Sequence, residues 1–376
     1  MKPAVYLDFN ATAPIRDEAV EAITQAFRTG GNASSVHSFG RAARRLLEDG
    51  REQVAALVGV SGDDVLLTGG GTEANNLALL GCGRPNVIVS AVEHPSVLAV
   101  RGGNEPIPVD GDGIIDLAAL EARLAAQSGE AVVSVMLANN ETGVLQPVGK
   151  VSEIAKRHGA LVHCDAVQAA GKIAVDMRAL GVDMLSLAAH KIGGPQGIGA
   201  LIVGPEVPLS PQIRGGGQER RRRAGTENIV GAAGFGAAAS AALAGLSNFA
   251  KLAGLRDRME EAVLSVASDA KMFGRTMMRL PNTSCFAVPN LPSDTQVMAL
   301  DMEGVAISSG SACSSGKVEA SHVLAAMGEH ELGVNTIRVS LGWTSGSGDV
   351  DRFVEVWRKA YLRNRERAGA EELVAS

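Results

Sequence analysis

Short apolar runs alternate with amphipathic stretches between about residues 60 and 205 of the 376-residue chain. Continuous apolar runs are typical of strands that are buried on both faces of a parallel sheet. The stretch 148–157 has helical periodicity and ends at His158-Gly159, a C-cap signal. This alternation predicts an α/β domain with a largely parallel sheet. The predicted strands are 65–67, 87–89, 131–137, 161–162, 184–187 and 200–203.

The pattern changes after about residue 249. A helical pattern over 252–267 is followed by a strand-like run at 285–288, which predicts a smaller α+β domain. We therefore expect a large domain over 14–248 and a small domain formed by 1–13 and 249–376. The uncharged run 228–248 consists mainly of Ala and Gly, so it predicts a buried helix rather than a membrane span.

Polar residues follow the predicted strands at five places. Because ligands of open α/β sheets bind beyond the carboxyl ends of the strands, these residues predict one shared site. They are Gly69 to Thr72, Glu93-His94, Asn139-Asn140, Asp165 and His190-Lys191.

The Gly-rich turn Gly69 to Thr72 leads from a strand into a helix. Free N–H groups at the start of a helix bind phosphate, and Thr72 would add a hydroxyl. Gly69, Gly71 and Ala74 also fit the dinucleotide pattern G-x-G-x-x-G/A, with Glu93 about 20 residues further on as a ribose ligand. The segment alone leaves open a phosphate cup, a dinucleotide site and an ordinary turn capped by Thr72.

Asp165 and Lys191 both stand at strand ends. A carboxylate there can hold a pyridinium nitrogen protonated, or it can cap the following helix. A lysine beside Gly-rich backbone can be buried, which lowers its pKa and favours Schiff-base chemistry, or it can point to water. A dinucleotide-dependent dehydrogenase has no use for this pair, whereas a pyridoxal-phosphate enzyme needs both residues.

Cys313 is surrounded by Ser and Gly residues, which predicts a mobile, exposed loop with a reactive thiol. Cys82, Cys164 and Cys285 lie in apolar or strand-like settings and are interpreted as packing residues. No Cys or His pair stands at metal-ligand spacing, so we expect no metal site.

Two weaker signals remain. His94 is suited to stacking on a cofactor ring and relaying protons, although a lone histidine at a strand end is often structural. The run Arg220 to Arg223 is either a nucleic-acid contact or a solvated or subunit-contact loop. A net charge of -6 and an aromatic content of 3% argue against nucleic acid as a partner.

The widely spaced cysteines suit a reducing compartment. The N-terminal residues lack the apolar core of a signal peptide. We therefore expect a cytoplasmic protein without membrane contact.

Taken together, these motifs resemble the cysteine desulfurase family, and they occur in the family's order over residues 6 to 342. They are Leu7-Asp8-x-Asn10-Ala11-Thr12, Gly70-Gly71-Thr72-Glu73-x-Asn75, Glu93-His94, Asn139 to Gly143, Asp165 to Gln168, His190-Lys191, Gly215 to Arg220, Ser308 to Cys313 and Ile337 to Ser340.

The resemblance implies an aspartate-aminotransferase-like fold of type I, pyridoxal 5'-phosphate as cofactor and a homodimer. The implied roles follow the motif positions. Lys191 bonds the cofactor, Asp165 its ring nitrogen and Gln168 its ring hydroxyl, and His94 stacks on the ring. Gly71, Thr72 and His190 hold the phosphate, with Thr226 from the other subunit. Arg338 binds the substrate carboxylate, and Asn140 lies beside the cofactor and also contacts the substrate.

The implied reaction converts L-cysteine to L-alanine and leaves a persulfide on Cys313, for delivery to a sulfur acceptor or iron–sulfur scaffold protein. Ala188 departs from the pattern, because many members place a phosphate-binding Ser there. Three alternatives remain: a selenocysteine lyase, another fold-type-I enzyme such as an aminotransferase, and the dehydrogenase built on Gly69.

Overall fold

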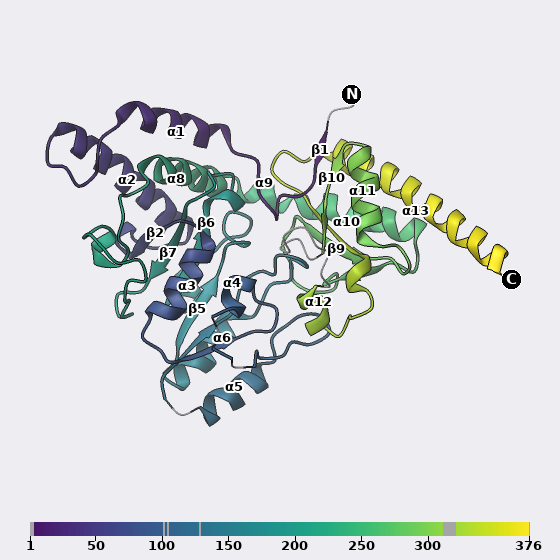
Figure 1. Cartoon of the computed structure of the whole chain (residues 1–376), viewed down its shortest axis with the longest axis horizontal. Helices are drawn as coiled ribbons and strands as arrows, with labels where there is room; N and C mark the ends of the chain where they lie inside the picture. Colours follow the sequence, from purple (N-terminus) through teal and green to yellow (C-terminus); the bar gives the residue numbers. More distant parts are fainter. Residues whose placement is uncertain (1–3, 101, 104, 128, 311–320, 376) are drawn as a thin grey trace.

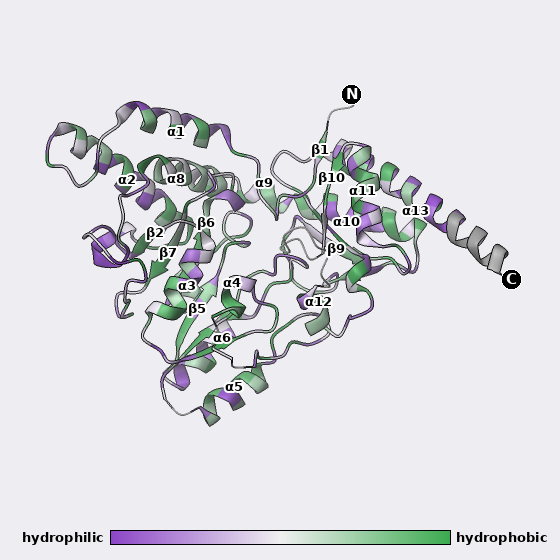
Figure 2. Ribbon diagram, viewed as in Figure 1, coloured by the Kyte–Doolittle hydropathy of each residue, from purple (hydrophilic) through white to green (hydrophobic). Residues whose placement is uncertain are grey.

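The computed structural model describes residues 4–100, 102–103, 105–127, 129–310 and 321–375. Figure 1 shows two parts: a larger one around a central sheet, and a smaller one from which the C-terminal helix projects. In Figure 2 the central strands are hydrophobic, whereas the outer helices alternate between hydrophobic and hydrophilic residues. This is the pattern expected when strands are buried on both faces and helices cover them with one face toward solvent.

The central sheet has six strands in the order β2-β7-β6-β5-β4-β3. Neighbouring strands from β3 to β6 are parallel, and β7 alone runs antiparallel to both of its neighbours. The predicted largely parallel sheet is therefore confirmed. The strands are β2 Val65–Thr68, β3 Asn86–Val89, β4 Ala131–Ser134, β5 Leu161–Asp165, β6 Met184–Ala188 and β7 Gly199–Val203.

Strand β4, which corresponds to the predicted strand 131–137, is shorter than the sequence predicts. The regular ladder of β4 ends at Ser134 instead of residue 137. The backbone still donates from Val135 to the His163 carbonyl and from Leu137 to the Asp165 carbonyl. The chain therefore keeps following β5 toward the carboxyl edge of the sheet, where the polar residues lie.

Helices cover both faces of this sheet, and α1, α2 and α6 among them are amphipathic. In α6, for example, Val148, Val151, Ile154 and Ala155 are buried at helical spacing. The helices of this part are α1 Asp17–Thr29, α2 Ser38–Leu57, α3 Gly71–Gly81, α4 Pro95–Leu98, α5 Leu117–Ala126, α6 Val148–Arg157, α7 Met177–Leu180 and α8 Ile229–Ala244, with short 3-10 turns η1 Gly62–Asp64, η2 Ala189–Lys191 and η3 Glu219–Arg221.

The Ala- and Gly-rich helix α8 packs against α1 and α2. A Cβ atom added to Gly50 of α2 would lie 2.4 Å from the carbonyl oxygen of Ala232 in α8. Small residues are therefore required where the two helix backbones meet, which explains why this buried helix consists mainly of Ala and Gly.

The smaller part has its own sheets and its own hydrophobic core. One sheet is antiparallel in the order β11-β12-β9-β8, and β1 pairs in parallel with β10. Its elements are β1 Val5–Tyr6, β8 Lys271–Phe273, β9 Thr283–Ala287, β10 Val305–Ala306, β11 Ser308–Ser309, β12 Thr336–Ser340, α9 Leu246–Ala250, α10 Leu252–Val266, α11 Ser293–Met302, α12 His322–Ala326, the 3-10 turn η4 Gly333–Asn335 and α13 Ser347–Ala375.

The N-terminal residues pack with the C-terminal third of the chain. Val5 and Leu7 share one core with Phe286, Trp357 and other residues between 249 and 361. The two ends of the chain therefore build the smaller part together, and the division at residues 14 and 248 stays a prediction.

No single helix in the described part of the chain is both long and apolar enough to cross a membrane. One bent pair, Ile229–Ala244 with Leu246–Val266, reaches the required length and composition jointly, with an angle of 61° between its halves.

Candidate active site

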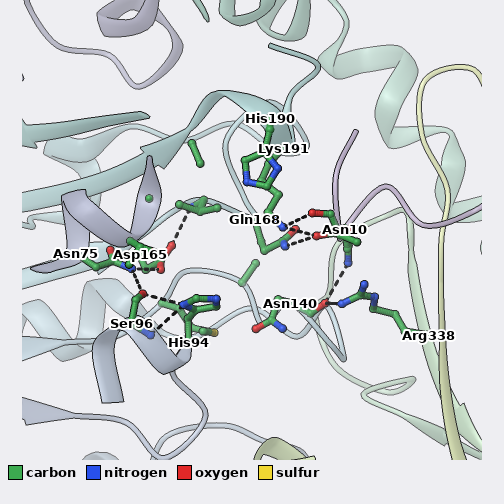
Figure 3. Close-up of a pocket in the computed structure, with 17 residues that line it drawn as sticks. Asn10, Asn75, His94, Ser96, Asn140, Asp165, Gln168, His190, Lys191 and Arg338 are labelled. Carbon is green, nitrogen blue, oxygen red and sulfur yellow. Dashed lines mark hydrogen bonds between the residues drawn. The ribbon is translucent and has the colours of Figure 1, made fainter. Parts of the chain in front are cut away.

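A cavity of about 230 Å³ lies at the carboxyl edge of the central sheet, between the two parts of the molecule (Figure 3). Each of the five polar clusters that follow the strands contributes at least one residue to the lining of this cavity. Nine of the eleven predicted site residues line it: Gly71, Thr72, His94, Asn140, Asp165, Gln168, His190, Lys191 and Arg338. Their roles stay predictions, but the structure brings them together.

The Gly-rich turn forms one end of the cavity. Gly70 precedes α3 with a φ of 151°, a conformation that favours glycine. A Cβ atom on Gly71 would lie 3.0 Å from a methyl group of Val167, so the turn also packs closely on the residue after the β5 end. Because α3 starts at the cavity wall, its free N–H groups suit an anion such as phosphate.

A carboxylate ties this turn to the arginine-rich loop. Glu73 accepts a hydrogen bond from the Gly69 N–H at 2.7 Å and pairs with Arg223 at 2.9 Å. Arg223 thus offsets a negative charge that lies next to the predicted phosphate position. At least one of the four arginines therefore supports the cup, which the sequence did not indicate.

Asp165 ends β5 and is 7% exposed. Its two oxygens accept hydrogen bonds from Asn75 Nδ2 at 2.7 Å and from the Val167 N–H at 3.0 Å. These contacts combine both sequence interpretations, because the carboxylate holds the following turn and also faces the cavity. A carboxylate fixed in this way can stabilise a protonated ring nitrogen.

Two histidines line the cavity and both favour the neutral form. Burial lowers the pKa of His94, with Asp165 acting in the opposite direction. Burial, Lys191 and Lys172 together lower the pKa of His190 to about 4. Neither imidazole therefore adds a positive charge near neutral pH.

Lys191 reaches across the cavity to the N-terminal segment. Its Nζ donates to the carbonyl oxygens of Asn10 at 2.6 Å and Ala11 at 2.7 Å. Asn10 also accepts from Gln168 Nε2 at 2.9 Å, and Lys172 donates to the Gln168 side-chain oxygen at 2.7 Å. Gln168 is thereby fixed with its amide group oriented by Lys172.

Arg338 lies on β12 and is 1% exposed. It donates to Asp8 Oδ1 at 2.8 Å and to the Asn140 carbonyl at 3.1 Å. Its buried Nε has no hydrogen-bond partner among the described residues. A buried guanidinium with an unsatisfied N–H fits an incoming carboxylate.

Two predicted residues are not part of this cavity as described. Cys313 lies outside the described residues. Thr226 is exposed on the loop before α8 and does not line the cavity. The other three cysteines, Cys82, Cys164 and Cys285, are buried and unpaired, and burial raises the pKa of each thiol. They match the packing interpretation.

The dinucleotide interpretation of the Gly-rich turn is wrong. Its proposed ribose ligand, Glu93, is 0% exposed. One carboxyl oxygen accepts from the Ser90 hydroxyl at 2.7 Å and from the Met136 N–H at 2.8 Å. Burial raises the pKa of Glu93 to about 8, so this group is a neutral structural acid beneath the cavity.

Four residues of the site were missed by sequence reasoning or were given no role. Asn10 and Asn75 stand inside motifs that were recognised, so their spacing was a usable signal. Ser96 and Lys172 carry no local signal, because their contacts depend on tertiary structure. No group of three or more His, Cys, Asp or Glu within the described ranges is arranged to hold a metal ion.

The donor set of the cavity fits pyridoxal phosphate. A helix N-terminus with Thr72 and His190 suits the phosphate, Asp165 suits the ring nitrogen, and Lys191 suits the covalent link. Arg338 lines the same cavity, and its guanidinium suits the carboxylate of an amino acid.

Comparisons with known proteins place the chain and its fold in a known family. The aminotransferase class-V family matches residues 5–353. A cysteine desulfurase from Cereibacter sphaeroides is 43% identical, over 98% of this chain and 99% of that protein. The X-ray structure of a NifS-like protein from Rickettsia africae superposes with a TM-score of 0.88 at 34% identity, covering 95% of this chain and 99% of the other.

A second solved structure, SspA in complex with cysteine, has a TM-score of 0.76 and 27% identity, covering 89% of this chain and 98% of the other. Fold and site therefore define a pyridoxal-phosphate-dependent class-V aminotransferase of fold type I. Within that class, the chain belongs to the cysteine desulfurase family.

Proposed function

We propose that this protein takes sulfur from free L-cysteine, releases L-alanine and carries the sulfur as a persulfide on Cys313. The observation that supports this best is the position of Arg338. Its buried guanidinium faces the same cavity as Lys191 and Asp165, so an α-amino acid bound by its carboxylate would present its Cα to the lysine.

The cofactor supplies an electron sink that stabilises negative charge at Cα. The residues of this chain do the rest. Arg338 binds and orients the carboxylate, and Asp165 holds the proton on the ring nitrogen. Lys191 Nζ removes the Cα proton, and the backbone carbonyls of Asn10 and Ala11 define where that amine lies.

In the sulfur-transfer step, the Cys313 thiolate attacks the sulfur of the substrate. The bond between Cβ and sulfur breaks, and Cβ gains a proton to give the methyl group of alanine. Cysteine and one thiol thus become alanine and one persulfide, with no external oxidant or reductant.

The described flanks of segment 311–320 support this assignment. On one side, Ser308 of β11 pairs with Arg338 of β12. On the other, His322 Nε2 hydrogen-bonds the carbonyl of Glu93, the residue before His94, at 2.9 Å. Both described flanks therefore contact Arg338 or the residue next to His94, and Arg338 and His94 both line the cavity.

Cys313→Ser tests the proposal. We expect the variant to retain the cofactor and bind cysteine, but to produce no persulfide, because a serine hydroxyl is a poor nucleophile toward sulfur. Alanine release and persulfide labelling by mass spectrometry are the measurements. Cys82→Ala, Cys164→Ala and Cys285→Ala serve as controls. Unchanged alanine release from Cys313→Ser would refute the assignment, and activity retained only with selenocysteine would favour a selenocysteine lyase.

We also propose that the protein is a homodimer in which Thr226 completes the phosphate site of the partner. Phe27 is 70% exposed, Val36 89% and Phe39 67% on α1 and around the start of α2. Large apolar side chains grouped in this way are typical of a subunit interface. If the surface binds a second copy of this chain, the same dimer would bring Thr226 to the phosphate site of the other subunit.

Mixing two inactive variants tests the composite site. Lys191→Ala and Thr226→Ala damage contributions from different subunits, so mixed dimers should contain some wild-type sites and regain part of the activity. Sedimentation of each variant alone provides the control. A strictly monomeric protein would contradict this proposal.

The sulfur then passes to an acceptor, for which we propose a sulfur-carrier or iron–sulfur scaffold protein in the cytoplasm. The unpaired state of the three described cysteines is compatible with a reducing compartment. Cell fractionation, followed by transfer of labelled sulfur from cysteine to proteins of each fraction, tests both parts.

A further inference from the structure

A chain of hydrogen bonds joins Asp165 to His94 along one side of the cavity (Figure 3). Asn75 Nδ2 lies 2.7 Å from Asp165 Oδ2 and 2.9 Å from Ser96 Oγ. Ser96 Oγ lies 2.7 Å from His94 Nδ1, and the Ser96 backbone N–H donates to the same nitrogen at 3.1 Å. Asn75 and Ser96 therefore connect the two groups that flank the predicted cofactor ring.

The direction of each hydrogen bond follows from what each group can do. A carboxylate only accepts, so the Asn75 amide must turn its NH2 group toward Asp165. Its second N–H then points at Ser96 Oγ. The Asn75 Oδ1 atom is buried without a partner in the described part of the chain, which agrees with an orientation set entirely by Nδ2.

The same reasoning fixes the histidine. Ser96 Oγ accepts from Asn75, so its own hydrogen is available for His94 Nδ1. The backbone N–H of Ser96 can only donate, and it points at Nδ1 as well. Nδ1 must therefore carry a lone pair, and the proton of a neutral imidazole must lie on Nε2.

We propose that Asn75 and Ser96 are positioning residues that hold His94 as the neutral Nε2–H tautomer, so that it presents a hydrogen-bond donor and not a base to the cofactor site. The lone pair that a base needs is occupied by Ser96. Proton abstraction is thereby left to Lys191. The inference deepens the proposed function and rests on it for the role of the cavity.

The charges around His94 support the neutral form. Burial lowers its pKa, Lys191 and His322 lower it further, and Asp165 opposes them. Protonation at Nδ1 would also place two hydrogens against each other at the Ser96 N–H. Geometry and electrostatics thus disfavour the imidazolium in the same way.

Nitrogen NMR of the holoenzyme labelled with 15N-histidine tests the inference directly, because protonated and unprotonated ring nitrogens resonate far apart. The His94 signal is assigned by its loss in His94→Gln. Between pH 6 and 8 we expect an unprotonated Nδ1 and a protonated Nε2. A proton on Nδ1, or rapid averaging of the two nitrogens, would overturn the proposal.

Variants test the two positioning residues. Ser96→Ala removes one of two donors to Nδ1, so the Nδ1 signal should move away from its hydrogen-bonded position, and Ser96→Thr should restore it. Asn75→Leu should move the signal in the same direction. In Ser96→Ala we expect kcat to fall about 2–10-fold with KM for cysteine unchanged, the loss of about one hydrogen bond.

Ser134→Ala is the matched control. The Ser134 hydroxyl lies 2.8 Å from Nδ1 of another buried histidine, His163, which does not line the cavity. This variant should move the His163 signal and leave that of His94 in place. A His94 Nδ1 signal that stays unchanged in Ser96→Ala would refute the role of Ser96. The signals need no turnover, so they remain informative even if the enzyme proves not to desulfurate cysteine.

Discussion

The two sides of the cavity are built in different ways. The floor, formed by Asp165 and His94 at the ends of parallel strands, is fixed by the Val167 and Ser96 N–H, each two residues away, and by Asn75 of the adjoining helix α3. The wall, formed by Asp8, Asn10 and Arg338, is held by contacts between residues 130 to 330 positions apart. The floor is therefore held within the larger part, by the sheet and the helix α3, whereas the wall exists only when the two ends of the chain meet.

The two sides also differ in charge. On the wall side, Arg338 pairs with Asp8, and burial together with Lys191 and Arg338 lowers the pKa of Lys172 well below its usual value. The floor carries the carboxyl group of Asp165. An amphoteric ligand, such as a pyridine ring linked to an amino acid, can satisfy both sides at once. The comparison predicts that mutations in the floor and in the wall affect different kinetic parameters.

The largest effect is expected where floor and wall meet, at Lys191. Lys191→Ala removes both the covalent link and the base, so kcat should fall at least about 10³-fold. The measurement is alanine release, together with the absorbance of bound cofactor. Lys150→Ala, on an exposed position of α6, is the control. Normal desulfuration by Lys191→Ala would remove the central assignment of the site.

A smaller and selective effect is expected from the wall alone. Arg338→Lys replaces a forked donor by a point charge, so KM for cysteine should rise about 10–100-fold while kcat changes little. Steady-state kinetics measure both constants. Arg279→Lys changes another buried arginine, paired with Glu260 at 2.6 Å in the smaller part, and should reduce stability without raising KM. An equal rise in both variants would mean that Arg338 is merely structural.

The smallest effect is expected beneath the floor, at Glu93. Burial raises its pKa from 4.5 to about 8, so between these values the unfolded chain has lost a proton that the folded chain keeps. Stability should therefore fall as the pH rises through this window. Glu93→Gln removes that dependence. The difference in Tm between the variant and wild type should therefore rise, in favour of the variant, by on the order of 2–4 °C from pH 5 to pH 8.

Glu153→Gln, on the exposed side of α6, should show no such gain. Desulfurase activity of Glu93→Gln near pH 7 should stay within about twofold of wild type, because the native carboxyl is already neutral there. A Tm difference that is independent of pH would contradict the assigned protonation state.

The contrast between floor and wall also explains what the sequence could predict. Apolar runs located the strands, and the rule that ligands bind at strand ends brought Thr72, His94, Asp165 and Lys191 to one cavity. Lys172 and Ser96 escaped prediction, because nothing in their local sequence shows which distant group they contact. Glu93 was misjudged for the same reason: spacing placed it correctly along the chain, but only the fold shows that it is buried.

Arg338 was predicted through the family resemblance and not through periodicity. Arg338 lies on β12, which pairs with β9, and its side chain donates a hydrogen bond to Asp8 near the opposite end of the sequence. Such a contact leaves no trace in a local pattern. Motifs from several segments, considered together, were needed to find it.

The pairing of β1 with β10 has a consequence for how the protein is made. The hydrogen bond between Asp8 and Arg338 spans 330 residues, and at about 5–20 residues per second a ribosome needs roughly 15–65 s to synthesise that interval. The six strands of the central sheet can pair before β10, the partner strand of β1, has been synthesised. Asn10, whose carbonyl accepts from Lys191, gains its contacts with Thr283 and Ser340 only after the last third of the chain has emerged. Loading of the cofactor into a finished cavity is therefore an event that follows translation.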